Sequence, residues 1–249
     1  MDKVLLITGG GRGIGAATAR LAAAAGYRVA INYLSDAKAA DALVQELKST
    51  GAKVIAVKGD VSKIDNVVRI FDETEEAFGP VTALVNNAGI TGKSSRLDDV
   101  DPQTIIDTIA INVNGAIFAA REAVRRMSTR HGGKGGAIVN ISSAAATVGS
   151  PGEYVWYAAS KGAIESLTIG LAKEVAEEGI RVNCVCPGMV ETEIHDRSTG
   201  DPARMERIRP MIPMKRIGRP QEIAEAIMFM LSEKSSYVTG ASLRVSGGR

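Results

Sequence analysis

The sequence predicts an α/β fold: a single doubly wound, Rossmann-type parallel sheet of about seven strands with helices on both faces, in one domain over residues 1–249. Three observations predict it. Short apolar runs alternate with longer helical segments at least six times, as when crossover helices join parallel strands. The first apolar run leads through a glycine-rich turn into a helix. Polar or glycine clusters follow most strands, at the edge where such sheets bind ligands.

The N-terminal half is expected to supply four strands and the helices between them. The first strand is a short apolar run, typical of a strand buried on both faces. We predict strands at residues 4–7, 28–32, 53–58 and 82–85, and helices at residues 16–25, 37–49 and 63–78.

The C-terminal half continues the alternation. A helix over residues 102–111 is expected to bend around Asn112 to Gly115 and to resume to about residue 128. A later helix contains Tyr157 and stops near Gly179, after a loop at residues 144–155. The remaining elements are strands at residues 137–141, 181–185 and 242–245 and a helix at residues 221–231.

Composition excludes several classes of protein. The chain is 45% hydrophobic and 23% charged, and its 30 basic and 28 acidic residues are interspersed, for a net charge of +2. No basic patch indicates nucleic-acid binding, and no acidic tract indicates disorder. No apolar run reaches the ~18 residues of a membrane span, and the early first strand leaves no room for a signal peptide. We therefore expect a cytoplasmic protein with no nucleic-acid or membrane partner.

Cys184 and Cys186 fall on one face of a predicted strand. A Cys-x-Cys pair can serve metal or redox chemistry, but no further cysteine pair or histidine cluster accompanies this one. We therefore interpret both as buried small hydrophobic residues and expect no metal site.

The turn after the first strand has the features of a dinucleotide-binding turn. Gly9, Gly13 and Gly15 stand between strand and helix, with a wider first gap than in G-x-G-x-x-G, and Arg12 and Ile14 lie among them. Glycines let the backbone turn tightly and approach a pyrophosphate, which then sits at the helix N-terminus.

The end of the second strand indicates which cofactor is bound. An acidic side chain near this point holds the ribose hydroxyls of NAD and repels the 2′-phosphate of NADP. No Asp or Glu occupies residues 31–35, which include Asn32, and Arg12 stands in the glycine turn. We therefore favour NADP(H) over NAD(H), although Asp36, one step beyond, leaves the preference open.

Further polar clusters follow the later strands. Asp60, beside Val61, is expected either to accept a hydrogen bond from an adenine amino group or to cap the helix beginning near Lys63. Asn86 to Gly89 suit a turn that braces the sheet and leaves space for a ligand. Asn112 is an amide in an apolar helical context and needs buried partners. The last clusters are Ser142–Ser143 and Pro187–Gly188.

Tyr157 and Lys161 carry the chemistry of the prediction. Four residues apart on a helix, they share one face and lie one turn apart. A nearby ammonium favours the phenolate, so we expect Lys161 to lower the pKa of Tyr157 from its ordinary value of ~10. Such a phenol can exchange protons near neutral pH.

In this order and over the full length, these motifs resemble those of the short-chain dehydrogenase/reductases, especially the branch of this length that includes 3-oxoacyl-carrier-protein reductases and glucose 1-dehydrogenases. They are Thr8-Gly-x-x-x-Gly-x-Gly15, Asn86-Asn-Ala-Gly89, Asn112, Ser143, Tyr157-x-x-x-Lys161 and Pro187-Gly188. The resemblance implies an oxidoreductase that transfers a hydride between a nicotinamide cofactor and a small-molecule carbonyl or alcohol substrate.

The resemblance also implies the site residues. Tyr157 is the general acid in reduction and the base in oxidation, and Lys161 lowers its pKa and binds the nicotinamide ribose. Ser143 holds the substrate oxygen, and Asn112, the fourth member of the catalytic tetrad, anchors a water in the proton relay. The residues expected to contact the cofactor are Gly9, Arg12, Gly13, Ile14, Gly15, Asn32, Asp60, Val61, Asn87, Ala88, Gly89, Tyr157, Lys161, Pro187, Gly188, Val190 and Thr192.

Two features depart from the family pattern. The interval from Ser143 to Tyr157 is fourteen residues, which is slightly long, so Ser142 stays an alternative to Ser143. Leu34 stands where related NADP-using chains often carry arginine, and this weakens the preference for NADP.

The resemblance further implies a substrate lid around residues 190–215 and a homotetramer. The methionines of the lid suit an adaptable apolar pocket. Its arginines are interpreted as a solvated face rather than as contacts to an anionic substrate; they are Arg204, Arg207 and Arg209. The tetramer would form through the helix of Tyr157 and the helix before it, where small residues permit close approach: Ala158, Ala159, Gly162 and Ala163.

One alternative function is a catalytically silent dinucleotide sensor on the same fold. Loss of the tyrosine or the lysine is the expected mark of such a sensor, and Tyr157 and Lys161 are both present. A sugar-nucleotide epimerase or dehydratase would need a larger substrate domain. Sugars, 3-oxoacyl thioesters, steroids and quinones all stay open as substrates.

Overall fold

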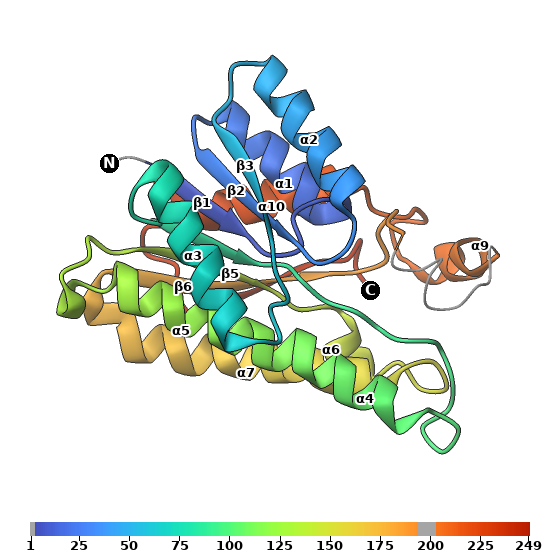
Figure 1. The fold of residues 1–249 in the computed structure, drawn as a ribbon. Helices are drawn as coiled ribbons and strands as arrows, with labels where there is room; N and C mark the ends of the chain where they lie inside the picture. Colours follow the sequence, from blue (N-terminus) through green and yellow to red (C-terminus); the bar gives the residue numbers. More distant parts are fainter. Residues whose placement is uncertain (1–2, 194–202) are drawn as a thin grey trace.

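The strands form one sheet in the order β3-β2-β1-β4-β5-β6-β7, and every neighbouring pair is parallel (Figure 1). The computed structural model describes residues 3–193 and 203–249. The strands are β1 (Val4–Ile7), β2 (Arg28–Tyr33), β3 (Val54–Lys58), β4 (Ala83–Asn86), β5 (Gly136–Ile141), β6 (Ile180–Pro187) and β7 (Ser242–Val245). The predicted doubly wound parallel sheet is confirmed.

Helices cover both faces of the sheet (Figure 1). One face carries α1 (Gly13–Ala24), α2 (Ala37–Ser49) and α10 (Pro220–Leu231), and the other carries α3 (Ile64–Phe78), α5 (Gly115–Met127) and α7 (Val155–Val175). The described residues also form α4 (Pro102–Ile109), which precedes α5, and the short α6 (Ala145–Val148) and α9 (Arg204–Ile208).

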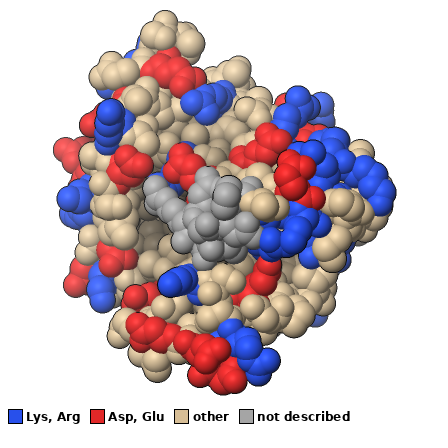
Figure 2. Space-filling model, turned by 90° about the vertical axis from the view of Figure 1, so that its right-hand side faces the viewer, with Lys and Arg blue, Asp and Glu red and all other residues tan. Residues whose placement is uncertain are grey.

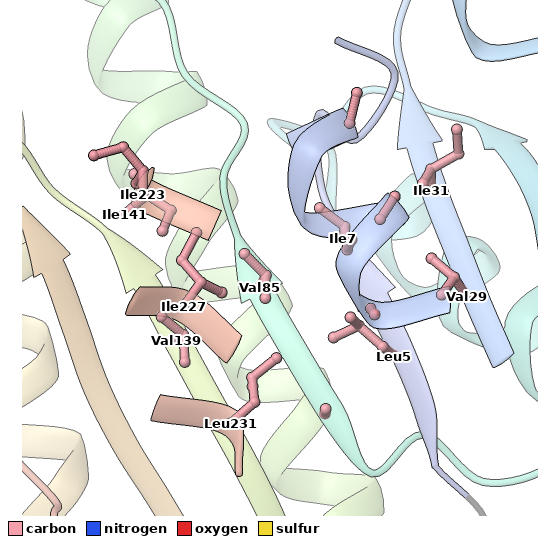
Figure 3. Close-up of a cluster of buried hydrophobic side chains, with 14 of the residues drawn as sticks. Leu5, Ile7, Val29, Ile31, Val85, Val139, Ile141, Ile223, Ile227 and Leu231 are labelled. Carbon is pink, nitrogen blue, oxygen red and sulfur yellow. The ribbon is translucent and has the colours of Figure 1, made fainter. Parts of the chain in front are cut away.

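Two apolar layers hold the helices to the sheet. Leu5 and Ile7 of β1 belong to the layer that includes Ile227 of α10 (Figure 3), whereas Leu6 belongs to the opposite layer with Phe71 of α3. Successive side chains of a strand point to opposite faces. Because both faces are covered, all four side chains of β1 are buried, which explains why this strand is a continuous apolar run.

Three local features differ from or refine the prediction. The expected bend around Asn112 is a π-helical turn, Ala110–Asn114, between α4 and α5. The predicted loop at residues 144–155 contains α6. β6 runs from Ile180 to Pro187 and is longer than predicted, because it pairs with β5 on one side and β7 on the other.

The strand order reverses between β1 and β4. At such a switch point the loops after two neighbouring strands run in opposite directions, and ligands bind in the crevice that opens between them. No helix within residues 3–193 and 203–249 combines the length and the apolar character needed to cross a bilayer.

Candidate active site

A cleft of about 1080 Å³ runs along the edge where the strands end, from Asp36 to Arg204. Figure 2 looks onto this side of the molecule and shows a hollow in its surface. Nearly all residues predicted to contact the cofactor line the cleft: Gly9, Arg12, Gly13, Ile14, Asn32, Asp60, Val61, Asn87, Ala88, Gly89, Tyr157, Lys161, Pro187, Gly188, Val190 and Thr192. Ser143 also lines it, whereas Gly15 and Asn112 do not.

The glycines of the turn serve different purposes. Gly9 has φ +61°, and a Cβ there would lie 2.9 Å from the Cα of Ala88. A Cβ on Gly15 would lie 2.6 Å from the carbonyl oxygen of Gly9 and 2.7 Å from Nδ2 of Asn87. Gly15 therefore lets α1 begin directly against the turn, and the structure gives this predicted cofactor residue a packing role.

Polar side chains hold the glycine turn after β1 in place. The Thr8 hydroxyl accepts a hydrogen bond from the backbone N–H of Asn87 (3.0 Å), and the Asn87 amide donates to the carbonyl of Gly9 (2.8 Å). The Asn32 side chain accepts from the N–H of Gly9 (3.3 Å) and donates to the carbonyl of Gly59 (2.9 Å). The predicted bracing by the turn after β4 is confirmed, and the side chain of Asn32 takes part in the same bracing.

The N-terminus of α1 opens onto the cleft. Arg12 occupies the N-cap position without a capping hydrogen bond, and the first turn carries no acidic residue. Helix N-termini present unpaired N–H groups and partial positive charge, which together bind phosphates. Because Gly13 and Ile14 of this turn line the cleft, the residues present fit the pyrophosphate of a dinucleotide.

Residues after β6 line the cleft beside the glycine turn. Val190 pairs with Gly218 in an isolated parallel bridge. A Cβ on Gly13 would lie 3.3 Å from Cγ2 of Thr192, so this side chain lies beside the N-terminus of α1. A Cβ on Gly188 would lie 2.7 Å from the Cα of Ser246, which shows that a glycine is required there by close backbone packing.

Charged side chains flank the Asp36 end of the cleft. Nη1 of Arg12 lies 3.4 Å from Oδ2 of Asp36 and 3.5 Å from Oε2 of Glu193. Asp36 also caps α2 by accepting from the N–H of Ala39 (3.1 Å). Since the Arg12 side chain is 39% exposed, solvent screens these pairs and they hold it weakly.

Asp60 lines the cleft but caps no helix. Its Oδ1 accepts from the N–H of Ser62 (2.9 Å), and α3 begins at Ile64 with Lys63 in the N-cap position. The capping interpretation is wrong, because this carboxylate braces the turn before the helix. Contact with an adenine amino group stays a prediction.

Tyr157 and Ser143 meet in the wall of the cleft. Burial raises the pKa of Tyr157, and a hydrogen bond with Ser143 opposes that rise. Ser142 is buried elsewhere, with its Oγ 3.0 Å from the carbonyl oxygen of Lys161 and 3.0 Å from Oε1 of Glu165. Of the two candidate serines, Ser143 is the one placed at Tyr157.

Lys161 lies one turn along α7, with Nζ 5.6 Å from the centroid of the Tyr157 ring. Its Nζ donates to the carbonyl of Ile141 (2.7 Å), and burial lowers the pKa of Lys161 to about 8. The expected net lowering of the Tyr157 pKa is wrong for this structure, because burial of the phenol is the largest effect on that pKa and raises it.

Asn112 lies in the π-helical turn and is buried. Its Oδ1 accepts from the N–H of Ile90 (2.8 Å), and its Nδ2 donates to the carbonyl of Ile90 (2.8 Å) and to Oγ of Ser160 (3.0 Å). Ser160 in turn donates to the carbonyl of Tyr157 (2.7 Å). The expected buried partners of this amide are thus found, and they connect it to the first turns of α7.

A polar cluster that the sequence analysis missed lies at the other end of the cleft. Arg204 is 3% exposed, and it donates to Oε2 of Glu153 (2.7 Å) and to the hydroxyl of Tyr154. The predicted solvated face is therefore wrong for Arg204, although it holds for Arg209, which forms an exposed pair with Glu206. A signal was available, because Glu153 and Tyr154 directly precede the helix of the predicted tetrad.

The two cysteines lie under α7. Their sulfurs are 3.8 Å apart, both are free thiols, and they pack with Ala116 and Ile164. Their interpretation as buried small hydrophobic residues is confirmed. Across the described residues, no group of three or more His, Cys, Asp or Glu side chains could hold a metal ion.

Comparison with known families shows which family the chain belongs to. The family model described as "Enoyl-(Acyl carrier protein) reductase" matches residues 9–249. The chain belongs to the short-chain dehydrogenase/reductase family. The resemblance stated from the sequence motifs is thereby confirmed.

Two similar proteins match this chain over nearly its whole length. It is 47% identical over 246 residues to the uncharacterized oxidoreductase YgfF of Escherichia coli (strain K12), covering 99% of each chain. It is 39% identical over 251 residues to an L-rhamnose 1-dehydrogenase (NAD(P)(+)) of Azotobacter vinelandii, covering 100% of this chain and 96% of the relative.

A solved structure leads to the same family. A short-chain dehydrogenase from Burkholderia cenocepacia J2315 in complex with NADP superposes with a TM-score of 0.91 at 35% identity, covering 100% of this chain and 98% of that one. This protein is accordingly an oxidoreductase of CH–OH and C=O groups that uses a nicotinamide cofactor, and the silent sensor gains no support from these comparisons.

Proposed function

We propose that this protein is an NADP(H)-dependent reductase that converts a carbonyl group of a small-molecule substrate to an alcohol, with Tyr157 as the general acid. The observation that carries the proposal is the Tyr157–Ser143 pair in the wall of a cleft that also contains the uncapped N-terminus of α1. The bound cofactor supplies the hydride. With its pKa raised by burial, the phenol of Tyr157 carries its proton at neutral pH, as the acid of a reduction must, and donating that proton requires stabilisation of the phenolate left behind.

Each member of the predicted tetrad has a task in this proposal. Ser143 binds the substrate oxygen, and Tyr157 delivers the proton to it. Lys161 binds the nicotinamide ribose, and its ammonium stabilises the phenolate that remains after proton transfer. Asn112 anchors a water of the proton relay; in support, a Cβ on Gly89 would lie 3.3 Å from Oδ1 of Asn112 and 3.4 Å from Nζ of Lys161, so both groups lie close to Gly89, which lines the cleft.

The preference for NADP(H) over NAD(H) is part of the proposal. Arg12 lines the Asp36 end of the cleft, and its ion pairs with described residues are exposed, so its guanidinium can pair with a 2′-phosphate. Asp36 opposes this preference, because its carboxylate lies in the same part of the cleft. The similar Burkholderia protein was solved with NADP.

Substitution of these two residues tests the preference. Arg12→Ala should weaken NADPH binding by about 10- to 100-fold, the value of a charge-assisted hydrogen bond, and leave NADH binding nearly unchanged. Asp36→Asn keeps a good N-cap for α2 and removes the negative charge, so it should strengthen NADPH binding relative to NADH. Fluorescence titration of both cofactors measures these affinities. Equal losses for NADPH and NADH in Arg12→Ala would reverse the cofactor assignment.

A screen of cofactor turnover tests the reaction. NADPH and NADH oxidation would be followed with ketones, aldehydes, quinones, steroids and 3-oxoacyl thioesters, and NADP⁺ reduction with aldoses. Sugars belong in the panel because one relative is an L-rhamnose 1-dehydrogenase. Cofactor binding without turnover of any carbonyl or alcohol would contradict the proposal and favour the sensor.

The expected single domain over residues 1–249, its substrate lid and its cytoplasmic location also stay proposals. Residues 190–193 and 203–215 supply part of the cleft wall, and residues 194–202 of the predicted lid lie outside the described residues. The free thiols of Cys184 and Cys186 suit a reducing compartment.

We propose that the protein assembles as a homotetramer through α4, α5 and α7. These helices expose Ile106 (57%), Ile117 (40%) and Ile169 (46%), and a Cβ on Gly162 would meet no atom within 4 Å. Ala158, one of the small residues predicted at this interface, is instead 5% exposed and packs inside the subunit. Light scattering at micromolar concentration should give the mass of four chains, and the mass of one chain would contradict the proposal.

A further inference from the structure

Arg204 reaches the catalytic helix from a segment far away in the sequence. It lies on α9, a helix of five residues, yet its side chain is 3% exposed. It donates to Glu153 through Nε (3.3 Å) and Nη2 (2.7 Å) and to the hydroxyl of Tyr154, and its Nη1 lies 3.7 Å from the sulfur of Met189. All four residues line the cleft.

Tyr154 connects this arginine to the proposed acid. Its ring meets the ring of Tyr157 edge-on, with centroids 5.4 Å apart and an angle of 88° between the planes. The guanidinium carbon of Arg204 lies 5.5 Å from the centroid of the Tyr154 ring. The Tyr154 hydroxyl also hydrogen-bonds to Glu153, and burial raises the pKa of Tyr154 to about 12, so this hydroxyl keeps its proton.

Burying the guanidinium of Arg204 beside Glu153 and Tyr154 is energetically unfavourable if its only purpose is to hold a loop in place. Removing a guanidinium from water is unfavourable, and apolar side chains of similar volume often stabilise a buried position equally well. By contrast, Arg209 and Glu206 of the same segment form an exposed, solvent-screened pair. The hydrogen bonds of Arg204 to Glu153 and Tyr154 are directional and lie in the wall of the cleft. This arrangement therefore points to a role in fixing the position of these side chains and not only in stabilising the fold.

We propose that Arg204 is a positioning residue for Tyr157. It holds Tyr154, and the ring of Tyr154 holds the phenol of Tyr157 in the orientation that reaches the substrate oxygen. The inference rests on the proposed function, in which Tyr157 donates the proton. Such an arrangement matters because a displacement of ~1 Å at a reacting group costs about 100-fold in rate.

A paired substitution tests the role of Arg204. Arg204→Met keeps the length and the contact with Met189, and Glu153→Gln in the same chain avoids an unpaired carboxylate. This double variant should lose about 10- to 100-fold in kcat and keep the wild-type Kd for NADPH. Arg204→Lys keeps a charge but not the two-pronged contact, so its kcat should be intermediate. Arg209→Met, the control on the same segment, should keep the wild-type kcat.

The path through Tyr154 is tested separately. Tyr154→Phe keeps the ring against Tyr157 and should lose less kcat than Tyr154→Leu, which removes the ring. In the Tyr154→Leu chain, the Arg204→Met and Glu153→Gln changes should cause no further loss, because residues that act in one path are not additive. Losses that multiply, or a kcat loss matched by an equal loss of NADPH affinity, would overturn the inference and leave Arg204 a structural role.

Failure of this inference and failure of the proposed function give different results. A wild-type chain without turnover, or a fully active Tyr157→Phe variant, overturns the proposed function and the positioning role with it. An inactive Tyr157→Phe variant combined with wild-type kcat in Arg204→Lys and in the folded double variant overturns the positioning role alone.

Discussion

Replacing Tyr157 with Phe is expected to abolish turnover while leaving the affinity for NADPH nearly unchanged. The substitution removes the hydroxyl that donates the proton, and loss of a general acid costs about 100- to 10,000-fold in rate. It keeps the ring, whose edge contact with Tyr154 at 5.4 Å does not involve the hydroxyl. The cleft therefore keeps its shape, and only the chemical step is lost.

Two measurements check this prediction. Initial rates of NADPH oxidation with the best substrate of the screen give the loss in kcat, and fluorescence titration gives the Kd for NADPH. Tyr237→Phe makes the same chemical change at a fully exposed tyrosine and should behave as wild type. Turnover by Tyr157→Phe at a rate similar to wild type would remove Tyr157 from its proposed role.

Lys161→Met is expected to abolish turnover as well, and at the same time to stabilise the fold at pH 7. Turnover is lost because the ammonium that binds the ribose and stabilises the phenolate is gone. Burial lowers the pKa of Lys161 from 10.5 to about 8, so below pH 8 the folded chain carries the full cost of a buried charge. A pKa change of one corresponds to about 1.4 kcal/mol. Allowing about 1 kcal/mol for the lost hydrogen bond to Ile141, the free energy of unfolding should rise by about 2 kcal/mol.

The prediction implies a specific pH dependence of the free energy of unfolding. Between about pH 8 and 10.5 the unfolded chain holds the Lys161 proton more tightly than the folded chain, so the contribution of Lys161 to wild-type stability rises with pH in that window. The advantage of Lys161→Met should therefore be largest at pH 7 and should disappear near pH 10, where the remaining cost of the buried charge equals the ~1 kcal/mol of the lost hydrogen bond. Urea unfolding at several pH values measures it.

A matched control lies on the same helix. Lys173 is exposed near the end of α7, so Lys173→Met should change neither turnover nor the pH dependence of stability. If Lys161→Met were less stable than wild type at pH 7, the hydrogen bond to Ile141 would outweigh the cost of the buried charge. That result would contradict the argument.

Local patterns in the sequence were sufficient to predict most of the fold. The helix at residues 37–49 and the strands at residues 4–7 and 242–245 were predicted with the bounds that the structure has. Apolar runs, glycine turns and helix stops act within a few residues of one another, so a single sequence displays them. The same locality explains why the glycine turn and Ser143 could be placed at one edge of the sheet, whereas the assignment of Tyr157 and Lys161 to the same site came from the family resemblance.

Only the tertiary structure decided the direction of the pKa shifts of those residues and which side chains surround them. The pKa of Tyr157 is raised and not lowered because burial depends on elements that pack around α7. Gly15 is required by the approach of Asn87, seventy-two positions later in the sequence. Arg204 is buried because it meets Glu153 and Tyr154 in the wall of the cleft. Periodicity and turn chemistry are local and readable in one sequence, whereas desolvation and ion pairing arise between distant residues and exist only once the chain has folded.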